Sequence, residues 1–254
     1  MKKIFLLISV CAVALQTQAE QLPMRLWYNT PATKFEESLP LGNGKLGALV
    51  YGGVDNNIIQ LNDITFWSGK PVNLDLDSKA YRWISEIRKA LFNEDYCTAD
   101  SLQHYVQGVN SQYYLPLSTL RIKDLNTGQY TNYHRQLSLD SALCSDSYTR
   151  AGVVYTREYF VSHPDNIIAI RLKASKPTKL NCVISMSSLV NSGVKVSDRQ
   201  ITMTGNATGD PKETIHFCSV LRVKNAGGSV SRTDSTLVVK DATEAILYIV
   251  NETS

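Results

Sequence analysis

Neither sign of charge is in large excess in this sequence, and long hydrophobic runs are missing. Lys and Arg number 26 against 23 Asp and Glu, a formal net charge of +3. This balance argues against a nucleic-acid or acidic-lipid partner, because both need a basic surface. The longest apolar stretch, residues 4–15, has 12 residues, whereas a membrane-spanning helix needs about 20. The sequence therefore predicts no nucleic-acid partner and no membrane span.

Motifs for metal, redox and covalent chemistry are also lacking. No two cysteines have the Cys-x-x-Cys spacing of zinc or dithiol sites, and the four histidines are scattered. No G-x-S-x-G elbow presents a nucleophilic serine. We therefore expect no cofactor and no metal. Three states stay open for the cysteines that follow residue 19, namely buried free thiols, disulfides or a metal site; these cysteines are Cys97, Cys144, Cys182 and Cys218.

The first 19 residues have the pattern of a signal peptide. Lys2 and Lys3 precede the apolar residues 4–15, and Thr17-Gln18-Ala19 is a small-x-small cleavage site. Removing the two lysines leaves 24 basic residues (26 − 2) against 23 acidic ones. The sequence thus predicts an exported protein, periplasmic or extracellular, whose mature part is residues 20–254.

The mature part reads as one all-β domain with a short helical insertion. A helical period over residues 78–91, with Ser78 as N-cap, and a second helix over 97–106 predict the insertion near 78–106. The remaining sequence alternates at period two between turns, which predicts an antiparallel β-sandwich. The predicted strands are residues 48–51, 58–61, 119–123, 130–139, 153–161, 166–174, 180–187, 200–204, 214–223, 235–239 and 245–250.

A literal G-x-G-x-x-G occurs at Gly42, Gly44 and Gly47. In a dinucleotide site this motif follows a buried strand and opens a helix. Here Pro40 interrupts the preceding segment, and Gly52-Gly53 closes the following one after four residues. We therefore interpret the segment as a glycine-punctuated β-hairpin and not as a nucleotide site.

The same residues carry a family resemblance. LPLGNG at 39–44, LGA at 46–48, Gly52-Gly53 and QLNDITFWSG at 60–69 resemble the N-terminal signature of glycoside hydrolase family 95, whose best-known members are α-L-fucosidases. The family more often has Glu-Asp after Asn62 and Leu in place of Phe66. Two later segments, YHRQLSLDSA at 133–142 and YTREYFVSHPD at 155–165, also resemble family strands. The resemblance covers nearly the whole mature chain but only the family's N-terminal domain, a β-supersandwich.

The resemblance implies a function. Family members hydrolyse terminal α-linked L-fucose, and related ones L-galactose, by inversion, with a glutamic acid as general acid and an Asn/Asp system that orients water. Those residues belong to an (α/α)6 barrel that follows the β domain. This chain reaches only Ser254, so no catalytic residue of the family has a counterpart here. We therefore expect the chain by itself to be inactive.

Local carboxylates do not replace the missing pair. Glu36 and Glu37 point opposite ways if their stretch is extended. Asp75 and Asp77 read as a solvated approach to the helix, and Glu158 lies beside Arg157 on a strand. We assign these side chains structural or solvated roles.

Three other residues are candidates for contact with a sugar or a neighbouring domain. They are Asn43, Asn62 and Trp67. A loop tryptophan can stack on a pyranose ring and an asparagine can hydrogen-bond a hydroxyl. The alternative is that Asn62 caps a turn and Trp67 packs against the helical pair or the barrel.

The sequence thus supports one leading function and two others. The leading one is the non-catalytic N-terminal domain of an exported family 95 hydrolase, with fucosylated glycan bound through the barrel. The second is a free-standing carbohydrate-binding module of the same fold. The third is an interaction domain that docks onto a partner carrying the barrel.

Overall fold

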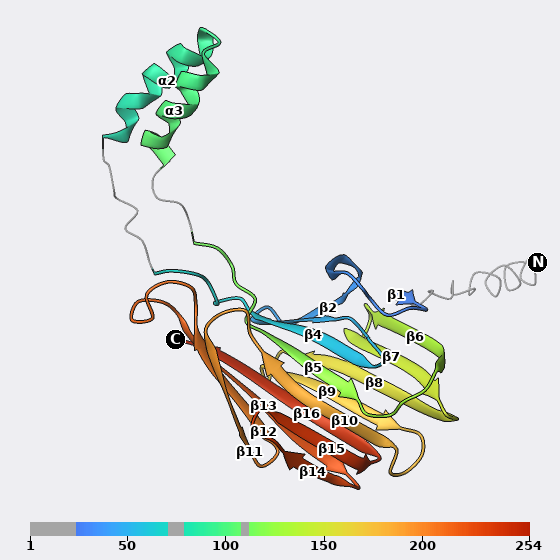
Figure 1. Cartoon of the computed structure of the whole chain (residues 1–254). Helices are drawn as coiled ribbons and strands as arrows, with labels where there is room; N and C mark the ends of the chain where they lie inside the picture. Colours follow the sequence, from blue (N-terminus) through green and yellow to red (C-terminus); the bar gives the residue numbers. More distant parts are fainter. Residues whose placement is uncertain (1–23, 71–78, 108–111) are drawn as a thin grey trace, which may run out of the picture.

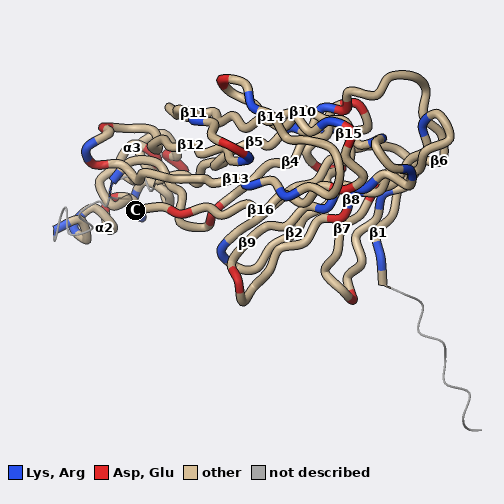
Figure 2. Tube along the Cα trace, turned by 90° about the horizontal axis from the view of Figure 1, so that it is seen from below, with Lys and Arg blue, Asp and Glu red and all other residues tan. Residues whose placement is uncertain are grey.

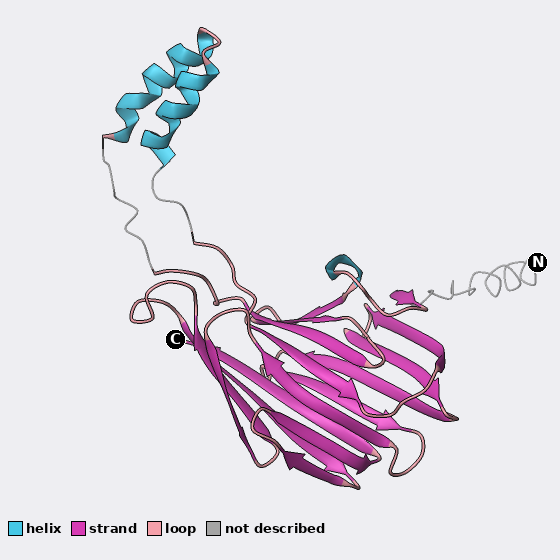
Figure 3. Ribbon diagram, in the orientation of Figure 1, coloured by secondary structure: helices cyan, strands magenta, loops and turns pink. Residues whose placement is uncertain are grey.

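The protein is an antiparallel β-sandwich with one helical insertion, as predicted (Figures 1 and 3). The structure is a computed structural model that describes residues 24–70, 79–107 and 112–254. The predicted signal peptide lies outside the described residues, as do Ser78, Asp75 and Asp77.

Two sheets form the sandwich, one of nine strands and one of seven. The nine-stranded sheet has the order β1 (Arg25–Tyr28), β6 (Tyr130–Ser138), β7 (Leu143–Arg150), β8 (Val153–Ser162), β9 (Ile167–Ala174), β16 (Glu244–Thr253), β13 (His216–Ala226), β12 (Gln200–Asn206) and β11 (Ser192–Ser197). The seven-stranded sheet has the order β14 (Ser229–Arg232), β15 (Thr236–Ala242), β10 (Leu180–Ser187), β5 (Ser118–Asp124), β4 (Asn56–Asp63), β3 (Leu46–Val50) and β2 (Leu39–Gly42).

The core lies between the facing sides of the two sheets. Strand β9 shows why, since Ile168, Ile170 and Leu172 alternate with more exposed neighbours and are almost fully buried. Ile59 and Leu61 of β4 do the same in the other sheet. All five belong to one continuous apolar cluster. The period-two pattern therefore places one face of each sheet in the core.

The predicted strands are all present, and the structure adds five that the sequence did not reveal. Strands β1, β2, β7, β11 and β14 were missed. Pro40 does not exclude a strand as we expected, because β2 is the edge of its sheet and an edge strand can do without one backbone N–H. Strand β7 hides its pattern because Asp146 and Arg150 occupy inward positions and are buried.

A buried ionic network explains these inward charges. The Nε of Arg157 donates to Asp146 Oδ1 at 2.6 Å, and the Tyr159 hydroxyl donates to Asp146 Oδ2 at 2.7 Å. Asn57 of the opposite sheet donates to the Tyr159 hydroxyl at 2.7 Å. Burial raises the pKa of Asp146 and the charge of Arg157 opposes that change. The network therefore links the two sheets through a chain of polar contacts inside an apolar core.

The helical insertion is a hairpin of α2 (Trp83–Phe92) and α3 (Tyr96–Gln107), preceded by the 3-10 turn η2 (Ala80–Arg82). The second helix extends the predicted 97–106 by one residue at each end. In Figures 1 and 3 the hairpin stands away from the sandwich. Within the described residues, no helix is long and apolar enough to cross a bilayer.

Basic and acidic residues are interspersed along the chain. In Figure 2 the Lys and Arg segments alternate with Asp and Glu segments, and neither sign gathers over one group of strands in that view. This arrangement matches the nearly balanced charge of the sequence.

Candidate functional site

Two of the family-like segments, residues 43–46 and 62–69, lie at one end of the sandwich. We call this the signature end and define it as residues 43–46, 62–69 and 252–254. Register brings the first two segments together, since Leu46 pairs with Asp63 and Gly47 with Asn62. The third segment joins them where the Thr65 and Thr253 hydroxyls lie 2.5 Å apart. Residues 188 positions apart in sequence therefore contribute to one surface.

Asn43 holds the turn between β2 and β3. Its Oδ1 accepts the backbone N–H groups of Lys45 and Leu46, at 3.0 and 2.7 Å. Its Nδ2 donates to the Ser162 carbonyl at 2.8 Å and to Asn166 Oδ1 at 3.0 Å. All four hydrogen-bonding positions of the amide are used inside the domain. Asn43 therefore ties this turn to the turn between β8 and β9.

A lysine bridges two carboxylates at the signature end. The Nζ of Lys45 lies 2.7 Å from Glu252 Oε2 and 3.9 Å from Asp63 Oδ2. Asp63 is completely buried, and its Oδ1 accepts the N–H and the hydroxyl of Thr65. A sugar at the surface cannot reach Asp63, and Lys45 holds Glu252. These carboxylates order the loop after β4 and are not arranged as an acid–base pair.

Asn62 lies next to Gly47 on the opposite side of β4 from the core residue Leu61. It is half-buried, and its Oδ1 has no hydrogen-bond partner among the described residues. Gly47 is not needed there for space, because a Cβ would meet the Asn62 Cβ at 3.6 Å, an ordinary contact. The glycine that the turn requires is Gly44, whose φ is +95°.

Trp67 belongs to an exposed aromatic patch, which we define as Ile64, Trp67, Tyr113 and Tyr114. Trp67 is 41% exposed, its Nε1 donates to the Ile64 carbonyl at 2.8 Å, and its ring meets Tyr114 edge-on at 5.5 Å. Burial, and then the charge of Asp63, raises the pKa of Tyr114. The neighbouring Phe66 points inward and is completely buried against Phe217. The patch is therefore an apolar surface fixed on a rigid base.

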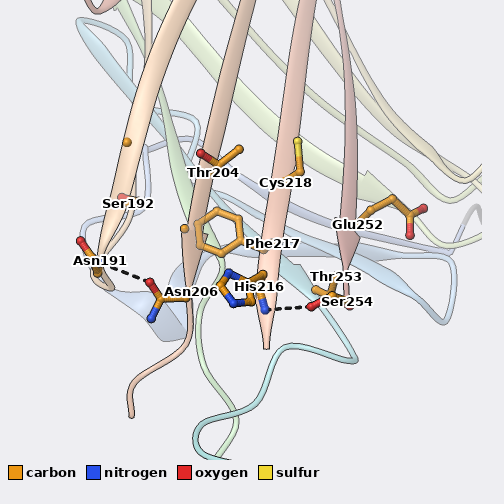
Figure 4. Close-up of a pocket in the computed structure, with 12 residues that line it drawn as sticks. Asn191, Ser192, Thr204, Asn206, His216, Phe217, Cys218, Glu252, Thr253 and Ser254 are labelled. Atoms are coloured by element: carbon orange, nitrogen blue, oxygen red, sulfur yellow. Dashed lines mark hydrogen bonds between the residues drawn. The ribbon is translucent and has the colours of Figure 1, made fainter. Parts of the chain in front are cut away.

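Beside the signature end lies an open groove of about 600 Å³ on the nine-stranded sheet (Figure 4). Asn191 donates to Asn206 at 3.2 Å across its floor, and the His216 ring lies 2.8 Å from the Pro211 carbonyl. The Phe217 ring is buried and offers no face for stacking. The groove residues are Asn191, Ser192, Gly193, Thr204, Gly205, Asn206, His216, Phe217, Cys218, Glu252, Thr253 and Ser254. No Trp or Tyr lies among the residues that line this groove.

The other carboxylates considered have structural partners. Glu36 and Glu37 lie in the 3-10 turn η1 (Phe35–Glu37) and not in an extended stretch, which corrects the expected geometry. The backbone N–H groups of Thr33 and Lys34 donate to Glu37 and lower its pKa. Glu158 is half-buried, and its carboxylate lies 3.4 Å from Arg171. Among the residues that line the groove, Glu252 is the single carboxylate.

The four cysteines among the described residues are all free thiols. Cys144 and Cys182 are buried in the core, Cys218 is half-buried and Cys97 is exposed. Burial raises the pKa of Cys182 to about 12, which makes it inert at neutral pH. The described part of the chain holds no group of three or more His, Cys, Asp or Glu placed to bind a metal.

Comparison with known proteins identifies relatives over nearly the whole described chain. The family described as "Glycosyl hydrolase family 65, N-terminal domain" matches residues 26–254. "Alpha-L-fucosidase 2" of Arabidopsis thaliana is 30% identical over 252 residues, which are 89% of this chain and 30% of that protein. "Probable alpha-fucosidase A" of Aspergillus niger is 30% identical over 176 residues, 66% of this chain and 22% of that protein. The chain thus spans less than a third of the length of these relatives.

A solved structure shares the fold. "Putative kojibiose phosphorylase from human microbiome" superposes with a TM-score of 0.51 over 92% of this chain and 33% of that protein, at 13% identity. At that identity the likeness concerns the fold alone.

Proposed function

Because the chain belongs to the glycosyl hydrolase family 65 N-terminal domain family, we propose that it is the non-catalytic β-sandwich domain of an exported α-L-fucosidase. The observation that carries the proposal is the composition of the signature end. There the family-like residues order a loop and expose an aromatic patch, while the two carboxylates, Asp63 and Glu252, do not form a pair open to a sugar. The activity that we propose for the longer protein is the one named for its relatives, alpha-fucosidase.

The partner of the signature end is a helical (α/α)6 barrel that follows in the same protein. Inverting hydrolysis of a terminal α-L-fucoside requires two carboxyl groups about 6.5–9.5 Å apart, with water between one of them and the sugar. The proposal places both groups, and the fucosylated glycan, in the barrel. In this proposal the aromatic patch packs against the barrel and forms part of the contact between the two domains. Such contacts within one chain typically bury about 600–1,500 Å².

Fucose release tests this assignment. A chain ending at Ser254 should release no fucose from 2′-fucosyllactose above the buffer rate. The product of the complete reading frame that contains this chain should release it, with the β-anomer formed first by NMR. Release by the shorter chain that Glu252→Gln abolishes would contradict the proposal, because Glu252 is the exposed carboxylate of the groove. If the longer product releases fucose with retention of the anomeric configuration, the inverting mechanism is contradicted but the domain assignment stands.

Trp67 also favours a second function, a free-standing carbohydrate-binding module. Its exposed ring could stack on a pyranose without any barrel. Isothermal titration of the chain ending at Ser254 with 2′-fucosyllactose separates the two. Saturable binding heat that the Trp67→Ser variant loses supports the binding module. If the shorter chain shows no binding heat while the longer product is active, the docking role is supported.

Export is a further expectation. In a Gram-negative host, the protein should reach the periplasm with Glu20 as its first residue, which intact-mass measurement detects as the loss of residues 1–19. Ala19→Arg should block cleavage, because the signal peptidase needs a small residue before the cut. Gln21→Arg is the matched control, and cytoplasmic protein that keeps Met1 would contradict export.

A further inference from the structure

The helical hairpin has its own internal seam. The rings of Trp83 and Tyr105 stack with centroids 4.6 Å apart, and Ala90 and Ala99 are buried between the helices. Small residues at such positions let two helices approach closely. Each of these contacts is made within the hairpin, so the hairpin holds its shape without burying its remaining apolar side chains.

One apolar stripe of the hairpin is left uncovered. Ile84, Ile87 and Leu91 follow the i, i+3, i+7 spacing that places side chains on one face of a helix. Ile84 is 42% exposed and Leu91 47%, and Ile87 between them is half-buried. Such a stripe is what an amphipathic helix presents to a partner groove. In Figure 1 the whole hairpin stands away from the strands of the sandwich.

The described residues just before the insertion lie at the same end of the sandwich as the last residues of the chain. The Gly69 N–H, just before the insertion, donates to the Thr208 carbonyl at 2.9 Å, and Lys70 forms an ion pair with Glu213 at 2.8 Å. At the other end of the same loop, the Ser254 N–H donates to the His216 carbonyl at 3.0 Å. A segment that continues past Ser254 therefore begins near the loop that Gly69 and Lys70, the last described residues before the insertion, also contact.

We infer that the stripe Ile84, Ile87 and Leu91 is a docking surface for the domain that follows Ser254 in the longer relatives. The inference rests on the proposed function, since it takes that domain as the partner of the signature end. The Arabidopsis relative is long enough to contain such a domain, because this chain spans 30% of that protein. The aromatic patch and the hairpin then contact that domain at two separate places, one on the rigid sandwich and one on the projecting arm.

Hydrogen exchange tests the inference with two proteins, the chain ending at Ser254 and the product of its complete reading frame. Peptides within residues 83–107 should exchange about tenfold more slowly in the longer protein, because docking suppresses local opening. Peptides over residues 64–69 report on the proposed function separately. Protection of 64–69 without protection of 83–107 overturns the inference and leaves the proposed function standing. Protection of neither overturns both, and a reading frame that stops at Ser254 overturns the inference.

A matched pair of variants separates docking from stiffening of the hairpin. Leu91→Asp places a charge on the stripe, whereas Lys89→Asp places the same charge on another face of the same helical turn. In the longer protein, Leu91→Asp should abolish the extra protection of residues 83–107 and Lys89→Asp should keep it. In the shorter chain, both variants should exchange alike. Equal loss in both longer variants overturns the inference.

Discussion

Replacing Asp146 with alanine should lower the free energy of unfolding by about 3–5 kcal/mol. The change leaves the Arg157 guanidinium buried without its counter-charge, and it removes the acceptor of the Tyr159 hydroxyl. Burial alone disfavours the charged form of an arginine, and the neighbouring Asp146 carboxylate overcomes that effect and raises the pKa of Arg157. Without the carboxylate, the cost of burying the charge remains. Urea unfolding followed by tryptophan fluorescence measures the loss.

The double variant Asp146→Leu with Arg157→Met is the control for this prediction. It removes both charges and refills the volume, so it should be more stable than either single variant, because a well-packed apolar replacement of a buried ion pair is often neutral. Arg171→Met is the surface comparison, since its partners Glu158 and Glu244 are solvent-accessible. Its effect should stay within about 1 kcal/mol. If Asp146→Ala costs no more than Arg171→Met, the network does not stabilise the sandwich.

Alternation along the strands made most of the fold predictable. Strand β9 is the plainest case, because Ile168, Ile170, Leu172 and Ala174 occupy every second position and are buried. Strand β7 has the same geometry but hides it, since Asp146 and Arg150 stand where apolar residues are expected. Their partners, Arg157 and Asp124, come from other strands. The spacing of hydrophobic residues along one strand cannot reveal ion pairs that form only when other strands pack against it.

The sequence predicted where the candidate site lies but not which residues form it. The signature marked the correct segments, and the register of β3 and β4 brings them together. Tyr113 and Tyr114 escaped notice because they enter the patch only through the bridge between Trp67 and Tyr114, 47 positions apart. Sequence alone also could not show that the side-chain amide of Asn43 makes its hydrogen bonds within the domain. Local motifs therefore locate a surface, whereas its members and their partners depend on the fold.

The same substitution at two neighbouring aromatic residues should destabilise the domain to different extents. Phe66→Ser should cost about 3–5 kcal/mol, because it opens a cavity beside Phe217 and buries a hydroxyl. Trp67→Ser should cost only about 1–3 kcal/mol, from one edge-on ring contact and one hydrogen bond to Ile64. Thermal unfolding of the chain ending at Ser254 compares the two.

Solubility should change in the opposite direction to stability for Trp67. Removing its 41% exposed ring reduces the aromatic patch, and exposed apolar patches promote association. Light scattering of concentrated protein should therefore fall for Trp67→Ser and rise for Phe66→Ser, which exposes core surface on unfolding. If Trp67→Ser unfolds the domain as Phe66→Ser does, the tryptophan is part of the core and its docking role is wrong. If Trp67→Ser folds but scatters as strongly as the parent chain, the patch is not the surface through which the isolated domain associates.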